Sequence, residues 1–351
     1  MLAGCEAAGP ESGELPIRYV TEEVEVATAF DEPLCEGDLR WLDKHTQRVE
    51  ALLGVEGELL RTVYAFDEDD VIDALRETGY LGIPGCQEGV LGCYYRDERI
   101  ALGIPQSLAH ELVHSVSNDL DPTYVRFWYE GLAEALSEHP TTYLPADLVA
   151  DSTSDDVLYI VAGHFIRWLI QRQGIEPIVR MFEGEPFEAV YGMSLAEMEH
   201  VYELEVPDVM PSPFACDEEP IVGELDGSFE LESTLDCSLP TTSRIRHLAS
   251  FDQIADIRVI TTEVDSTYIV ETAGVDQVRI GGCQSEPGDL VEQLGDVEND
   301  AYLLASINPA RTTEVFPGQE VFLPASTYRV VLLAAETGEP QPILFSLTPV
   351  E

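Results

Sequence analysis

The chain has 351 residues, with 67 Asp and Glu against 18 Lys and Arg, a formal net charge of -49 and 45% hydrophobic residues. This length and composition predict a globular protein of two domains, and no apolar run is long enough to predict a membrane span. The charge excludes nucleic acid as a partner, because nucleic-acid binding needs a basic surface. The acid is spread along the chain and Lys44 is the single lysine, a pattern as typical of salt-adapted proteins as of acidic secreted ones.

One cysteine stands apart near the N-terminus. Leu2-Ala3-Gly4-Cys5 resembles the lipobox of bacterial lipoproteins, in which the cysteine receives the lipid. Small and polar residues follow it. We therefore expect residues 1–14 to form a tether with Cys5 as the lipidation site, and membrane contact only through that anchor.

The remaining cysteines are even in number and contain no CxxC pair, which favours three disulfides in an oxidising compartment over a metal site. They are Cys35, Cys86, Cys93, Cys216, Cys237 and Cys283. Six cysteines allow 15 pairings, and the sequence does not choose among them. Because Cys86 and Cys93 flank a Gly-rich turn, we expect a local bridge there. The cysteine pattern places the protein outside the cytoplasm, in the bacterial cell envelope or secreted.

Residues 15–206 are predicted to form one domain that begins with a mixed sheet and helices. In chain order we expect a strand, a helix, a strand, a helix and an edge strand, over Leu15–Phe30, Asp38–Gly54, Leu59–Phe66, Asp69–Thr78 and about Glu98–Ile104. Asp38 has the side chain of an N-cap, and Gly54 ends the first helix. Helical signals then continue to about residue 205.

The segment His110-Glu111-Leu112-Val113-His114 is an HExxH motif. On a helix, residues four apart lie on one face, so His110 and His114 are able to bind one zinc ion. Glu111 then lies beside the metal, where it is placed to accept a proton from a zinc-bound water. The motif predicts a catalytic zinc site with Glu111 as general base.

A catalytic zinc needs a third protein ligand and an open position. Glu130 lies sixteen residues after His114, which allows a turn and an antiparallel return. Glu134 lies one helical turn further on the same face, where it is placed to accept the N–H of a ligating imidazole. We expect Glu130 as the third ligand and Glu134 as its support. Structural zinc is disfavoured, because structural sites use thiolates and fill all four positions.

HExxH followed by a helix with the sequence Trp-Tyr-Glu-Gly-Leu-Ala-Glu resembles the gluzincin metallopeptidases, in particular the bacterial peptidase MA-like group. Residues 162–170 and 187–198 are similar to later helices of that family, so the resemblance covers about residues 100–205. It implies a gluzincin-type catalytic domain that acts on a peptide or protein. The zinc ligands and general base that it implies are His110, His114, Glu130 and Glu111.

The resemblance also suggests a donor for the oxyanion. In the aminopeptidase branch of the clan, a tyrosine precedes a leucine by ten residues and a glycine by fifteen, and Tyr159 stands at that spacing from Leu169 and Gly174. The alternative donors are Tyr143, Tyr191 and His164. The Gly-x-Met-Glu-Asn signature of the exopeptidases is missing, which favours an endopeptidase.

Prolines 207, 211, 213 and 220 follow the helices, so we expect a Pro-rich linker over residues 207–220. Short β-runs separated by turn residues come next, which predicts an accessory β-sandwich over residues 221–351. The runs are Ser228–Leu235, Ile257–Thr262, Thr267–Glu271, Val278–Ile280, Tyr302–Ala305, Glu320–Leu323 and Tyr328–Ala334. The whole chain is thus predicted to be α+β.

Together these features predict zinc-dependent hydrolysis of peptide bonds outside the cytoplasm. The alternative is a non-catalytic surface lipoprotein that uses a peptidase fold for binding. The intact HExxH motif with Glu130 favours the enzyme. The sequence leaves open the substrate, the oligomeric state, the role of the C-terminal domain and the origin of the acidity.

Overall fold

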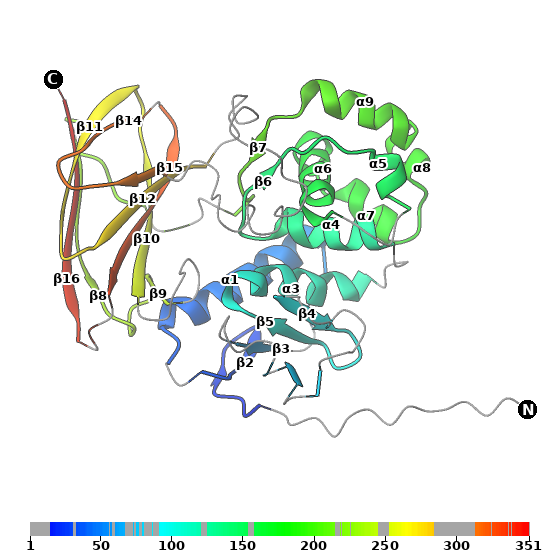
Figure 1. Ribbon diagram of the computed structural model, residues 1–351, viewed down its shortest axis with the longest axis horizontal. Coiled ribbons are helices and arrows are strands. Elements are labelled where there is room, and N and C mark those ends of the chain that lie inside the picture. The colour runs from blue at the N-terminus through cyan, green and yellow to red at the C-terminus, as the bar shows by residue number, and fades with distance from the viewer. Residues whose placement is uncertain are drawn as a thin grey trace, which may run out of the picture.

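The computed structural model describes residues 15–350 apart from 31–32, 56, 58–59, 67–72, 74, 77–78, 81–85, 87–90, 121–124, 154–157, 215–217, 219, 225, 245–252, 284–312, 324, 336 and 338. Figure 1 shows a small sheet with covering helices at the N-terminal end, a helical part above it, and a pair of larger sheets beside both. The predicted α+β class is confirmed. The tether with Cys5, Cys216, the strand expected at Tyr302–Ala305 and most of the helix expected at Asp69–Thr78 lie outside the described residues.

The N-terminal sheet has five strands in the order β1-β2-β3-β5-β4. Their bounds are β1 Tyr19–Val20, β2 Val24–Thr28, β3 Arg61–Ala65, β4 Gly92–Tyr95 and β5 Ile100–Gly103. Strands β2, β3 and β5 are parallel, and β1 and β4 run antiparallel at the two edges. The strand predicted over about Glu98–Ile104 is present as β5, but its predicted position at the edge of the sheet is wrong. β5 is internal because the preceding strand β4 forms a hairpin with it and occupies its other side, and the sequence analysis assigned no strand to residues 92–95.

Helix α1 (Glu36–Leu53) and helix α3 (Pro105–Ser117) pack on this sheet. Buried Leu42 of α1 and Leu108 of α3 share one core with Val63 of the sheet. Gly54 ends α1 as predicted, with a left-handed φ of 68° that glycine adopts without a Cβ clash. Asp38 is not the N-cap. Cys35 takes that position, and Asp38 lies in the first turn.

The helical part carries α4 to α9 and a short antiparallel pair of strands. Their bounds are α4 Arg126–Leu136, α5 Leu148–Asp151, α6 Tyr159–Gln173, α7 Glu176–Phe182, α8 Phe187–Tyr191, α9 Leu195–Glu205, β6 Thr141–Thr142 and β7 Val209–Met210, with a 3₁₀ turn at Asn118–Leu120. Helices α4 and α6 approach closely at Gly131 and Gly163. A Cβ on Gly131 would stand 2.9 Å from the Cβ of Ala162, so glycine is needed there for the contact.

The segment predicted as a Pro-rich linker is packed over much of its length. Met210 and Phe214 are buried in the core of the helical part, and β7 pairs with β6. Residues 207–214 therefore belong to the helical part of the fold. The prolines end α9 but do not make a free tether, because buried apolar side chains between them fix the chain.

The C-terminal region forms two antiparallel sheets, in the orders β13-β12-β15-β10-β9 and β14-β11-β16-β8. The strands are β8 Phe229–Leu235, β9 Thr242–Ser243, β10 Gln253–Thr261, β11 Ser266–Ala273, β12 Gln277–Gly282, β13 Thr313–Val315, β14 Glu320–Leu323, β15 Thr327–Ala335 and β16 Gln341–Pro349. Side chains of both sheets share one core, among them Val330 and Phe345, as expected of a β-sandwich. The sequence prediction missed β16, which contains two prolines that suggest a loop.

Helix α1 is tied to the sandwich at its N-terminal end. A disulfide joins Cys35 to Cys237. The buried carboxylate of Asp38 accepts hydrogen bonds from the backbone N–H of Arg244, at 2.9 and 3.1 Å, and from the hydroxyl of Ser243. Asp38 therefore joins two domains, a role that its position near a helix start does not reveal.

A second contact joins the sandwich to the turn after α4. The guanidinium of Arg329 on β15 lies 3.7 Å from the carboxylate of Glu138. Near the first contact, a Cβ on Gly37 would stand 2.2 Å from the carbonyl oxygen of Thr242, so the two backbones are in close contact. The sandwich is thus packed against the rest of the fold at two places, one at α1 and one at the turn after α4.

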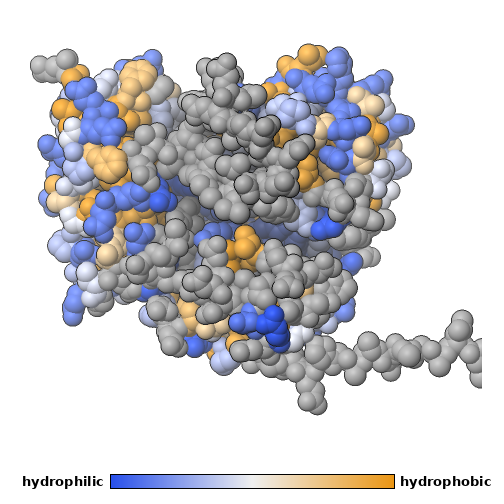
Figure 2. All heavy atoms as spheres, in the orientation of Figure 1, coloured by the Kyte–Doolittle hydropathy of each residue, from blue (hydrophilic) through white to orange (hydrophobic). Residues whose placement is uncertain are grey.

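The predicted local bridge is confirmed, since Cys86 and Cys93 form a disulfide. Cys283 is disulfide-bonded as well. Disulfides of this kind are typical of proteins in oxidising compartments. None of the described helices has the length and apolar character needed to cross a bilayer. On the face shown in Figure 2, hydrophilic residues are spread over both the sandwich and the helical part, in keeping with acid spread along the chain.

Candidate metal centre

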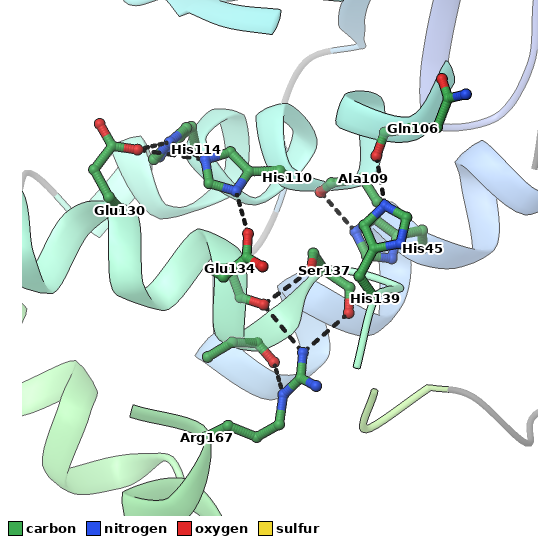
Figure 3. Close-up of polar contacts among 11 residues, drawn as sticks. His45, Gln106, Ala109, His110, His114, Glu130, Glu134, Ser137, His139 and Arg167 are labelled. Carbon is green, nitrogen blue, oxygen red and sulfur yellow. Dashed lines mark hydrogen bonds and ion pairs between the residues drawn. The ribbon is translucent and has the colours of Figure 1, made fainter. Parts of the chain in front are cut away.

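Helix α3 carries the HExxH motif. Ile104 is its N-cap in extended conformation and Pro105 its first residue, where a missing N–H costs nothing. Leu108 and Leu112 are fully buried toward the sheet. His110 and His114 lie four residues apart and point together toward α4 (Figure 3). The helical period therefore places both imidazoles on the side facing α4, as predicted.

Three predicted ligands meet at one point. Nε2 of His110 lies 3.0 Å from Nε2 of His114, and Oε2 of Glu130 lies 3.3 and 3.0 Å from these two nitrogens (Figure 3). Bonds of about 2.0–2.1 Å to a tetrahedral zinc place neighbouring ligand atoms about 3.3 Å apart. The three side chains thus have the donor types and the spacing of three corners of a zinc tetrahedron. Among the described residues, their ligand atoms lie close enough together to hold one metal ion.

Glu134 lies behind the ligands. Its Oε2 is 3.3 Å from Nδ1 of His110 (Figure 3), so the carboxylate is placed to accept that N–H while Nε2 faces the other ligands. This contact fixes the tautomer and the ring orientation of His110. The structure brings Glu134 to the position that the helical period predicts.

Charge in the centre favours a cation. Burial opposes a proton on His110, but hydrogen bonds to Glu130 and Glu134 outweigh burial and raise its pKa well above the ordinary value. Burial likewise disfavours the charged form of Glu130, yet the neighbouring His114 and His110 lower the pKa of Glu130 far below its usual range. Two partly buried carboxylates around two imidazoles therefore create a negative potential at the point where the ligand atoms meet.

Glu111 lies beside the ligands and is not one of them. Its side chain is buried, and burial raises its pKa to about 8. The edge strand β4 lies next to this side chain, since a Cβ on Gly92 would stand 2.8 Å from Oε1 of Glu111. The carboxylate therefore lies against the backbone of an edge strand and within electrostatic reach of His110 and Glu130.

Tyr159 begins α6 and lies close to His110, with 6.0 Å between ring centroids. Nη2 of Arg126 donates a hydrogen bond of 2.9 Å to its hydroxyl oxygen, and the guanidinium lies 5.7 Å from the ring centroid. Since Arg126 and Glu130 are four residues apart on α4, the same helix face carries a ligand and the cation next to Tyr159.

The alternative oxyanion donors lie elsewhere. Nδ1 of His164 is 2.7 Å from the hydroxyl of Tyr202, and the rings of Tyr143 and Tyr202 pack edge to face. Tyr191 is buried against Phe187 of α8. Among the four predicted donors, Tyr159 is the one whose ring packs near a predicted metal ligand, His110.

Two further histidines fasten α3 to its surroundings. Nε2 of His45, on α1, donates to the carbonyl oxygen of Ala109 at 3.0 Å, and Nε2 of His139 donates to that of Gln106 at 2.8 Å (Figure 3). These contacts lie directly before the HExxH motif along the chain. They fix the start of the helix against α1 and against the turn that follows α4.

Arg167 of α6 holds the end of α4. The fully buried guanidinium donates to the carbonyl oxygens of Ala135 and Met210 at 2.8 and 2.9 Å, and to that of Glu134 at 3.0 Å (Figure 3). Carbonyls at a helix C-terminus have no partner within the helix, so Arg167 satisfies them and completes α4 next to Glu134.

Sequence reasoning missed four residues of the centre, which are Arg126, Tyr129, Tyr94 and Gly92. Arg126 and Tyr129 lie within one turn of Glu130, so the helical period of α4 was a usable signal for both. Tyr94 and Gly92 come from β4, and no local signal places an edge strand beside α3.

No family model matches the chain, and no curated protein sequence matches it. A solved structure with some similarity is a periplasmic inhibitor of g-type lysozyme from Aeromonas hydrophila, with 12% identity, a TM-score of 0.21, and coverage of 38% of this chain and 96% of the inhibitor. A TM-score this low supports no inference about this chain. The gluzincin resemblance therefore stays a prediction.

Proposed function

We propose that the protein is a zinc-dependent peptidase, more an endopeptidase than an aminopeptidase, that works outside the cytoplasm. The observation that carries this proposal is the meeting of His110, His114 and Glu130 within the spacing of a zinc tetrahedron, with Glu111 beside them. Three protein ligands leave one position for substrate or water, as catalytic zinc sites do and structural sites do not.

A bound zinc would supply the positive charge that polarises a carbonyl and activates water. The residues of the chain do the remaining work. Glu111 accepts the proton of the attacking water and passes it to the leaving amine. Tyr159 donates a hydrogen bond to the oxygen on which negative charge develops. Glu134 keeps His110 oriented during this process.

The edge strand β4 supports an extended peptide as substrate. β4 pairs with β5 on one side, and among the described strands no other is paired with it. A peptide added along the other side would gain main-chain hydrogen bonds. Because Gly92 of β4 is in contact with the Glu111 carboxylate, such a peptide would pass next to the general base.

The disulfides support an extracytoplasmic location for this activity. We propose Cys5 as the lipid anchor that would hold the enzyme at the cell envelope. Mass spectrometry of the protein from membranes would test the anchor, because an unmodified Cys5 in soluble protein would contradict it without bearing on catalysis.

The decisive experiment compares wild type with Glu111→Gln. Zinc content is measured by elemental analysis and cleavage with casein and a peptide library, with and without chelator. We expect about one zinc per chain in both proteins, and cleavage by wild type alone, lost on chelation. Glu188→Gln on α8, distant in the chain from the centre, serves as the matched control. Equal cleavage by Glu111→Gln would refute the general base, and bound zinc with no cleavage by wild type would favour the non-catalytic binding protein.

A further inference from the structure

The two histidine ligands are supported in different ways. Nδ1 of His110 has the carboxylate of Glu134 at 3.3 Å. Nδ1 of His114 is buried, and none of the described residues offers it a hydrogen-bond partner. In most zinc sites the second nitrogen of each ligating imidazole donates to a carboxylate or carbonyl, which fixes the ring orientation. His114 therefore needs another support to keep Nε2 directed at the other ligands.

Aromatic rings occupy the surroundings of His114. The ring of Tyr129 is stacked on the imidazole, with 4.2 Å between centroids and 17° between planes. The ring of Tyr94 is also nearly parallel to it, at 6.5 Å and 27°. Tyr94 comes from β4, which precedes α3 in the chain, and Tyr129 comes from α4, which follows α3. By comparison, no described tyrosine stacks on His110: the ring of His114 meets it edge to face at 4.7 Å, and the ring of Tyr159 is tilted by 33° at 6.0 Å.

We propose that Tyr129 is a positioning residue that holds the plane of the His114 imidazole by stacking, in place of the missing hydrogen bond. This inference rests on the metal site of the proposed function. Rotation of the imidazole about its Cβ–Cγ bond would turn Nε2 away from Glu130 and bring the ring edge into Tyr129. Stacking at 4.2 Å blocks that rotation. Tyr129 directly precedes Glu130, so one turn of α4 supplies both a ligand and the support of another ligand.

The test compares Tyr129→Phe with Tyr129→Leu. Phenylalanine keeps the ring and loses the hydroxyl, whereas leucine keeps apolar bulk and loses the flat ring. The zinc dissociation constant is measured by competition with a chromophoric chelator, and cobalt spectra report the ligand geometry. We expect Tyr129→Phe to match wild type within about twofold, and Tyr129→Leu to bind zinc about three- to tenfold more weakly, as the loss of an aromatic contact predicts. Glu134→Ala, which removes the acceptor for Nδ1–H of His110, should weaken binding by about 10- to 100-fold.

Each outcome decides the question. Wild-type zinc affinity in Tyr129→Leu overturns the inference, and so does an equal loss in Tyr129→Phe, which would assign the effect to the hydroxyl. A purely structural role would lower the melting temperature of the metal-free protein but leave the zinc affinity and cobalt spectrum unchanged. If wild type itself binds no zinc, the proposed function fails together with the inference, whereas zinc binding that ignores Tyr129 contradicts the inference alone.

Discussion

Gly92 of β4 and Glu111 of α3 are in contact: a Cβ on Gly92 would stand 2.8 Å from Oε1 of Glu111 and 2.3 Å from Oγ of Ser107. The register pairs Gly92 with Gly103, and a Cβ on Gly103 would also clash with Ser107, at 2.2 Å. Because neither glycine has a Cβ, the Ser107 and Glu111 side chains fit against the hairpin, and Glu111 is the general base of the proposed reaction.

We expect Gly92→Ala to displace the Glu111 carboxylate and to lower kcat by about tenfold or more, since small misplacements of reacting groups have large effects. Zinc binding should be retained, because the clash does not involve a ligand. Gly282→Ala is the control, since a Cβ there meets nothing within 4 Å. Steady-state kinetics with a peptide substrate provide the measurement. An unchanged kcat in Gly92→Ala would show that Glu111 is not confined by the strand.

Arg126 should act through Tyr159. Arginine only donates, so its 2.9 Å hydrogen bond uses the hydroxyl oxygen of Tyr159 as acceptor and directs the phenolic proton to another partner. Removal of an oxyanion donor by Tyr159→Phe should lower kcat by about 10²-fold or more. Arg126→Met should lower kcat less, by about tenfold, and should have no further effect in Tyr159→Phe. A double-mutant cycle measures this coupling, and additive losses would contradict it.

Arg167→Met should destabilise the fold. The substitution removes the guanidinium donor from the buried carbonyl oxygens of Ala135 and Met210, whereas that of Glu134 still accepts from the hydroxyl of Ser137 at 2.9 Å. We expect a cost of about 3–5 kcal/mol in the free energy of unfolding. Arg172→Met on the same helix is the control. Its guanidinium pairs with Glu205 in an exposed position, so we expect a change below about 1 kcal/mol. Denaturant unfolding compares the two variants, and similar losses would argue against the capping role.

His164 should make stability depend on pH. Burial, assisted by the nearby Arg167, lowers its pKa from 6.5 to about 3. Below pH 6.5 the unfolded chain binds a proton here that the folded chain does not, so the free energy of unfolding falls as pH decreases from 6.5 toward 3. The contribution above pH 6.5 is constant. Each pH unit in the window removes about 1.4 kcal/mol.

We therefore expect wild type to lose about 2 kcal/mol more than His164→Gln between pH 6.5 and 4.5, as measured by urea unfolding. The exposed His200 on α9 offers a control, because His200→Gln should keep the wild-type dependence. A His164→Gln variant whose stability falls as steeply as that of wild type would show that carboxylates alone produce the acid sensitivity.

The part of the centre built on helical periodicity was predictable from the sequence. His110, His114, Glu130 and Glu134 follow a period that the sequence displays, and the structure brings these four side chains together. The contribution of β4 was not predictable, because its glycine disfavours a strand assignment and no local pattern shows which helix a strand lies beside.

Two errors in the predicted fold have the same origin. Asp38 has the sequence context of a helix cap, yet its carboxylate binds Ser243 and Arg244, more than 200 residues away. The prolines after residue 206 suggest a free linker, yet Phe214 between them fills the helical core. Local composition indicates which conformations a segment favours, but it does not show which distant residues the segment contacts in the fold.

The bridge between Cys35 and Cys237 also sets an order for biogenesis. The two cysteines are 202 residues apart, whereas Cys86 and Cys93 are seven apart. During vectorial synthesis Cys35 is exported long before its partner exists, at a stage when Cys86 and Cys93 are already available to react with it. Any early wrong bridge must be undone by thiol–disulfide exchange after the sandwich has emerged. Correct assembly of the N-terminal helix therefore waits for the start of the sandwich, and production in a host that lacks disulfide isomerase activity should yield mispaired chains.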